Sequence, residues 1–150
     1  MKKVLIGLFI FVFALGVASQ AKLAIGVDVV ADMNSLSLSN DFTDQIVGKV
    51  GLNYASIGGA SVTGYGVEVD YLFPVKWGVA TPLIGVDFNS DGAAAATTTL
   101  AVKLGVEAEV ADGVSLSAGI TPYSNATLSG ASTATTQTRG VWLGVYVDLN

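Results

Sequence analysis

The stretch that decides the fold is Leu100-Ala-Val-Lys-Leu-Gly-Val-Glu-Ala-Glu-Val110, in which apolar residues alternate with small or charged ones. A period of two places the even-numbered apolar side chains on one face of a β-strand, and Lys103, Glu107 and Glu109 on the other. A helix would need apolar residues every three or four positions instead. The stretch therefore predicts a strand with one apolar and one polar face.

The same alternation recurs along most of the sequence, with two weaker cases. The segment 77–88 changes parity at Pro82, where we expect a bulge because proline has no N–H to donate. The segment 35–39 is short and contains only two leucines between serines. Eight strands are predicted in all, at residues 23–29, 35–39, 49–54, 65–73, 77–88, 100–110, 114–121 and 141–149.

The connections between these segments fall into two sets. They are the short turns at 40–44, 74–76 and 111–113 and the generally longer connections at 31–34, 56–63, 89–96 and 124–138. Short turns at one rim and longer loops at the other are typical of up-and-down β-barrels in outer membranes. An even number of strands places both ends of the barrel at the rim of the short turns.

Eight aromatic residues lie at the predicted strand ends rather than along the strands. Beside the short turns are Phe42, Tyr71, Phe73 and Trp77, and beside the longer connections are Tyr54, Tyr65, Phe88 and Tyr123. Membrane barrels carry such aromatic girdles at both interfaces. In a soluble barrel, aromatic rings would more often fill the core. The pattern therefore predicts a membrane barrel with two girdles.

Composition supports this reading. Of the residues, 51% are hydrophobic and 13% charged, yet no apolar run after residue 21 is long enough for a membrane helix. A hydrophobic chain without helical spans favours a closed barrel, which satisfies every backbone hydrogen bond between its strands. The formal net charge of −5 argues against nucleic acid as a partner, because binding phosphates requires clustered basic residues.

The first residues have the pattern of a secretory signal. Lys2 and Lys3 precede an uncharged apolar run over 4–18, and Ser19, Gln20 and Ala21 follow it. A basic start, an apolar middle shorter than a membrane span and a small-residue exit are typical of a cleavable signal peptide. We expect a signal peptide at residues 1–21 and a barrel domain at residues 22–150.

Two pieces of the sequence resemble a known family. Residues 110–116, Val-Ala-Asp-Gly-Val-Ser-Leu, and residues 140–149, Gly-Val-Trp-Leu-Gly-Val-Tyr-Val-Asp-Leu, are similar to the short-turn hairpin and the closing strand of small eight-stranded outer-membrane barrels of the outer-membrane-protein-A and opacity-protein type. The resemblance extends over the whole barrel domain in pattern more than in sequence. It implies the outer membrane of a bacterium with a double envelope, contact with its lipids and insertion by the barrel-insertion machinery.

The sequence contains no His and no Cys, which removes most common nucleophile, general-base and zinc sites. Asp87, Asn89, Asp91 and Gly92 follow the opening of a calcium loop, but the position of its bidentate Glu is Thr98. We therefore expect neither an enzyme nor a cofactor nor a metal.

The polar face is expected to fill a narrow interior, because a barrel of eight strands has little more room than its own side chains need. We expect internal ion pairs there. If the hairpin through 56–63 is tight, Lys49 lies nearly opposite Asp70, while Lys103 and Glu68 both lie opposite Pro82 on its two flanking strands. Glu107 shares their face. On the same face, Trp142 and Tyr146 are expected to occlude the lumen.

These features predict an all-β, eight-stranded antiparallel up-and-down transmembrane barrel with a structural role in the envelope, and adhesion through its longer loops. Two alternatives stay open. Inward glycines would suit a narrow passive pore for small polar solutes. An inward apolar face would suit a soluble, lipocalin-like carrier of an apolar ligand. The fold alone does not choose among these functions, and the sequence names no host or neighbouring-cell partner.

Overall fold

The computed structural model describes residues 22–30, 33–57, 60–91, 97–128 and 134–149, so the signal peptide expected at 1–21 lies outside the described residues. Eight strands occupy these ranges: β1 (Leu23–Val30), β2 (Met33–Thr43), β3 (Ile46–Ile57), β4 (Ala60–Leu72), β5 (Ala80–Ser90), β6 (Thr97–Ala111), β7 (Val114–Leu128) and β8 (Ala134–Asp148). Within the same ranges, no helix has the length and apolarity needed to cross a membrane.

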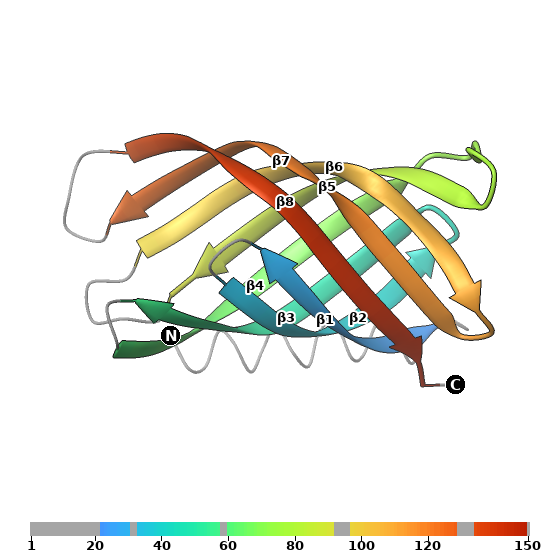
Figure 1. Ribbon diagram of the computed structural model, residues 1–150, viewed down its shortest axis with the longest axis horizontal. Coiled ribbons are helices and arrows are strands. Elements are labelled where there is room, and N and C mark those ends of the chain that lie inside the picture. The colour runs from blue at the N-terminus through green and yellow to red at the C-terminus, as the bar shows by residue number, and fades with distance from the viewer. Residues whose placement is uncertain (1–21, 31–32, 58–59, 92–96, 129–133, 150) are drawn as a thin grey trace.

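Each strand pairs antiparallel with its neighbours in sequence, and β1 also pairs with β8, so the sheet closes into a barrel. The strands run obliquely to the long axis of the barrel (Figure 1). The predicted fold class, an eight-stranded antiparallel up-and-down barrel, is confirmed. The segment 35–39, the weakest strand of the sequence pattern, is the middle of β2.

The expected contrast between short turns at one rim and longer loops at the other is only partly met, because β4 and β5 are joined by residues 73–79, whereas β1–β2 and β3–β4 are separated by two residues each. We call the end with the connections β2–β3, β4–β5 and β6–β7 the turn rim, and the opposite end the loop rim. β1 begins and β8 ends at the turn rim (Figure 1). There the β6–β7 connection is a tight turn in which Gly113 has a φ of 68°, a conformation that glycine adopts without strain.

The strands place apolar side chains outside and polar ones inside. Along β8, Val141, Leu143 and Val145 point outward and are 63%, 56% and 45% exposed, whereas Trp142 and Tyr146 point inward and are buried. The same parity holds in β1, where Val27 is exposed. This distribution is the reverse of that in a soluble protein, whose apolar side chains gather inside.

The prediction of a bulge at Pro82 is wrong. Strand β5 begins at Ala80, and its register with β6 runs without interruption through Pro82, which pairs with Val106. Trp77 precedes the strand, in a turn where Gly78 has a φ of 69°. The change of parity arises because Trp77 and its neighbours belong to this turn and are not constrained to alternate.

The prediction of longer connections at 56–63 and 124–138 is also largely wrong, because strands occupy most of the described residues of both ranges. β3 and β4 remain paired up to Ile57 and Ala60. β7 continues to Leu128, and β8 already begins at Ala134. The extra residues are mainly Ala, Ser and Thr, which pair through their backbones without the apolar alternation that reveals the other strands. The connection 89–96 lies mostly outside the described residues.

Eight aromatic residues lie near the two ends of the outer apolar face. The turn belt consists of Phe42, Tyr71, Phe73 and Trp77, and the loop belt of Tyr54, Tyr65, Phe88 and Tyr123. In the turn belt, the rings of Tyr71 and Phe73 meet edge to face, with 5.2 Å between their centroids. Trp77 is the most exposed member of either belt, at 69%.

Candidate functional site in the barrel lumen

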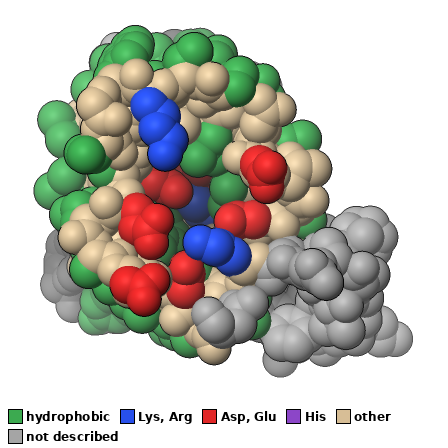
Figure 2. Space-filling model, turned by 90° about the vertical axis from the view of Figure 1, so that its right-hand side faces the viewer, with side chains coloured by type: hydrophobic (Ala, Val, Ile, Leu, Met, Phe, Trp, Pro, Cys, Tyr) green, Lys and Arg blue, Asp and Glu red, His purple; other side chains and the backbone are tan. Residues whose placement is uncertain are grey.

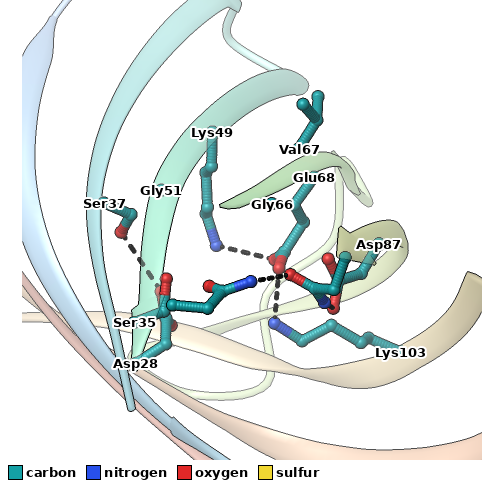
Figure 3. Close-up of a pocket in the computed structure, with 12 residues that line it drawn as sticks. Asp28, Ser35, Ser37, Lys49, Gly51, Gly66, Val67, Glu68, Asp87 and Lys103 are labelled. Atoms are coloured by element: carbon teal, nitrogen blue, oxygen red, sulfur yellow. Dashed lines mark hydrogen bonds and ion pairs between the residues drawn. The ribbon is translucent and has the colours of Figure 1, made fainter. Parts of the chain in front are cut away.

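Four charged side chains meet in the middle of the lumen and form the lumen cluster: Lys49 from β3, Glu68 and Asp70 from β4, and Lys103 from β6. The Glu68 carboxylate lies 3.1 Å from the Lys49 ammonium and 2.7 Å from that of Lys103. The Lys49 ammonium also lies 2.6 Å from Asp70. Figure 3 shows both lysines reaching toward Glu68 from opposite sides.

The structure brings together the residues of the two expected pairs, but in a different register. Lys49 lies directly opposite Glu68, two positions from Asp70, because Ser56 pairs with Ser61 in the hairpin above. Glu68 lies opposite Asp87 and Lys103 opposite Gly85, so neither faces Pro82 as expected. The expected pairing of Glu68 with Pro82 failed because β5 begins only after the turn that contains Trp77.

The cluster is almost sealed from water. Lys49, Glu68, Asp70 and Lys103 are between 1% and 8% exposed. Transfer of a single charge into such a site would be costly, so these charges are stable there only as partners of one another. The cluster therefore occupies the middle of the lumen and pairs its charges with one another.

The rings of Trp142 and Tyr146 cover the two ammonium groups. Lys103 Nζ lies 4.1 Å from the centroid of the Trp142 ring, and Lys49 Nζ lies 4.6 Å from that of Tyr146. Both distances suit cation–π contact, which adds to the ion pairs. Trp142 also donates a hydrogen bond from Nε1 to the carbonyl of Ile120, at 3.3 Å. Both rings thus occupy the interior, where the sequence places them.

Inward glycines provide the space that these side chains occupy. A Cβ atom at Gly26 would lie 2.2 Å from Cδ1 of Tyr146, and one at Gly85 would lie 2.1 Å from Oδ1 of Asp70. Neither distance is compatible with a real Cβ atom, so any larger residue would displace its neighbour. The space beside these glycines, which could have indicated an open channel, is instead filled by the side chains that face them.

A second polar group lies toward the loop rim and was not identified from the sequence as a site. Asp28 accepts hydrogen bonds from Tyr146 Oη, at 2.5 Å, and from Ser37 Oγ, at 3.2 Å. On the other side, Asn53 donates to Asn89 at 2.6 Å, and Asn89 donates to Asp87. The sequence could have identified Asp28 as a lumen residue, because it lies two positions after the inward Gly26 and so points to the same face of the strand.

Two cavities flank the lumen cluster, and Lys49 lines both. The inner one, between the cluster and the Asp28 group, has a volume of about 30 Å³, enough for one or two water molecules. The other measures about 190 Å³ and opens at the turn rim. Figure 2 shows acidic and basic side chains around this opening.

Glu107 lies in the cavity at the turn rim, apart from the cluster in which the sequence placed it. Lys22 and Asp148 also line this cavity, with 3.6 Å between their charged groups. Among the described residues, no group of three Asp or Glu side chains is placed to hold a metal ion. The lumen thus offers buried ion pairs and hydrogen bonds.

No family model and no curated protein matches the chain in sequence. Among solved structures, it is similar to the N-terminal β-barrel domain of OprF from Pseudomonas aeruginosa, with a TM-score of 0.59. The match covers 86% of this chain and 96% of that domain, at 11% sequence identity. This likeness shows the fold that the resemblance predicted: the chain is a closed eight-stranded β-barrel of the outer-membrane type.

Proposed function

We propose that this chain is a non-enzymatic outer-membrane barrel with a closed lumen, and that its role in a double bacterial envelope is structural. The observation that carries the proposal is the reversed distribution of side chains. Leu52 and Leu143 are each 56% exposed on the outer face, while Lys49 and Lys103 are 3% and 2% exposed inside. Such an outer face is costly in water, at about 25 cal/mol per Å² of apolar surface, and is stable in lipid.

The interior supports a structural role. The lumen cluster, Trp142 and Tyr146 fill the barrel with side chains that bind one another. The soluble carrier that the sequence left open would need its apolar face turned inward around a ligand. The structure turns that face outward and places charges inside, so it does not support a carrier.

Extraction and electrophoresis test the membrane assignment. We expect the protein to remain in the membrane fraction of disrupted cells after washing with salt, and to need detergent for extraction. In detergent, the unheated protein should migrate differently from the boiled one, because a closed barrel resists unfolding by the detergent. Extraction by salt alone, together with identical migration, would contradict the proposal.

A narrow pore is a second candidate, favoured by the two cavities on either side of Lys49. The buried cluster between them opposes it, because an ion would have to displace Lys49 or Lys103 from Glu68 to pass. Recordings from planar bilayers decide between the candidates. A structural barrel should give no steady current, whereas long-lived channels in the unmodified protein would favour the pore.

Adhesion is a third candidate, which would act through the loop rim. There β6 and β7 pair as far as Thr97 and Leu128, and Thr127 is exposed. Such a polar edge could meet another cell, and comparing the attachment of cells with and without the protein tests this role. Equal attachment of the two would contradict it.

A further inference from the structure

The lumen cluster and the inner cavity beside it hold more acidic than basic side chains. The described residues there carry four carboxyl groups and two ammonium groups, which are Asp28, Glu68, Asp70 and Asp87, and Lys49 and Lys103. Lys49 is engaged by Glu68 and Asp70, and Lys103 by Glu68. If every carboxyl group were ionised, two negative charges would remain uncompensated, which is costly in a site with so little exposure to water.

The two carboxyl groups without an ammonium partner are those of Asp28 and Asp87. Among the described residues, no ammonium group lies within 4.0 Å of either carboxylate. They lie on opposite walls of the inner cavity, Asp28 on β1 and Asp87 on β5 (Figure 3). Asp28 accepts hydrogen bonds from the hydroxyl groups of Tyr146 and Ser37, which stabilise its negative charge. The hydrogen bond that Asp87 accepts comes from the neutral amide of Asn89.

Asp87 also faces a second carboxylate across the sheet, because it lies directly opposite Glu68 where β4 pairs with β5. The Cβ atoms of such a pair are about 5 Å apart, and like charges at this spacing repel. The other titratable groups that line the cavity are Asp28 from β1, Lys49 from β3 and Lys103 from β6. Both lysines bind Glu68, so the negative charge of the opposed pair resides on Glu68 rather than on Asp87.

We propose that the inner cavity is a binding site for one proton, which Asp87 carries at neutral pH. Asn89 donates to Oδ2 of Asp87, which leaves Oδ1 to carry the proton. The proton removes the repulsion between Asp87 and Glu68, and Asp28 keeps its two hydroxyl donors. Loss of the proton at alkaline pH would place a second negative charge opposite Glu68, where it competes for Lys103. This inference concerns the lumen alone and goes beyond the structural role proposed above.

A proton bound in the folded state makes stability depend on pH. In the unfolded chain, an Asp side chain is ionised above about pH 4. Folding above that pH therefore takes up a proton, and the folding equilibrium constant decreases as the pH rises, by up to about tenfold per pH unit. An Asp87 that is ionised in both states would add no such dependence.

Urea unfolding of the protein in vesicles measures this dependence. Between pH 5 and pH 8, the folding equilibrium constant of the unmodified protein should decrease at least about tenfold. Asp87→Asn keeps the shape of the side chain but does not titrate, so its decrease should be at least about tenfold smaller, and at the alkaline end this variant should be the more stable protein. The matched control, Asp44→Asn, removes the same charge from an exposed turn and should keep the full decrease. A constant that does not change with pH in the unmodified protein, or a less stable Asp87→Asn at the alkaline end, would overturn the inference.

Infrared spectroscopy at neutral pH locates the proton independently of stability, because a protonated carboxyl group has a carbonyl band that a carboxylate lacks. We expect this band in the unmodified protein and in Asp28→Asn, and its loss in Asp87→Asn. A band that persists in Asp87→Asn, or one that is absent from the unmodified protein, would show that Asp87 does not carry the proton.

A metal cation is the other source of positive charge that a cavity of about 30 Å³ could hold. Replacing choline chloride by sodium or potassium chloride, at constant ionic strength and neutral pH, should leave the folding equilibrium constant within about twofold. A larger increase with either salt, together with no carboxyl band, would place a cation in the cavity instead of a proton.

Discussion

Replacing Glu68 by Gln tests the lumen cluster at the carboxylate that both ammonium groups share. Lys49 retains Asp70, at 2.6 Å, after the change. Lys103 loses the carboxylate at 2.7 Å and retains the ring of Trp142, at 4.1 Å. Lys103 is 2% exposed, so bulk water has little access, and the inner cavity that it lines has room for only one or two water molecules to replace the lost partner. The substitution therefore removes the carboxylate that forms the ion pair with the buried Lys103 ammonium.

Removing one partner of a buried ion pair typically costs about 3–5 kcal/mol, and we expect Glu68→Gln to lower the free energy of unfolding by this amount. The cation–π contact is present before and after the change, so it does not offset the loss. Lys103→Met in the same protein removes the unpaired charge and keeps the stem of the side chain. The double variant should recover about half of the loss or more.

Urea unfolding of the protein in vesicles, followed by Trp fluorescence and circular dichroism, measures these differences. Asp44→Asn is the matched control, because it removes the same charge from an exposed turn. Its effect should stay within about 0.5 kcal/mol. If Glu68→Gln cost no more than Asp44→Asn, or if the added Lys103→Met brought no recovery, the cluster would not be the sealed ion-pair group described above.

Three further outcomes are expected. Gly26→Ala should lower the free energy of unfolding by about 1–3 kcal/mol, because its Cβ would displace the Tyr146 ring. Gly140→Ala is the matched control, because no atom lies within 4 Å of the added Cβ. Equal losses of stability in the two variants would argue against a filled lumen. In intact cells, a membrane-impermeant maleimide should label Thr127→Cys. It should label Asp112→Cys only after the outer membrane is opened, and the opposite pattern would reverse the orientation.

Strands in which apolar and polar residues alternate could be predicted from the sequence. The stretch 100–110 and the closing strand meet an apolar exterior on one face and a polar lumen on the other, so their pattern determines which face points outward. Residues 124–128 and 134–138 carry no such contrast, and their pairing was found only in the structure. At Trp77, the pattern was misleading because a turn imposes no alternation.

The sequence predicted which charged side chains point into the lumen, but not which of them lie opposite one another. Parity alone places Lys49, Glu68, Asp70 and Lys103 on one face. Which pairs meet depends on where each hairpin turns, and a shift of two residues exchanges Asp70 for Glu68 opposite Lys49. Apolar periodicity repeats every two residues, so it cannot distinguish such registers.

The hydrogen bond from Tyr146 to Asp28 joins the last strand to the first, across 118 residues of chain. The pair Lys49–Glu68 spans 19 residues and can form as soon as one hairpin does, whereas the bond at the seam needs the whole chain. Closing longer loops is slower, so the seam should form last during folding. Until β8 docks against β1, the charged interior remains open to water along one side, and the arrival of the final strand expels that water.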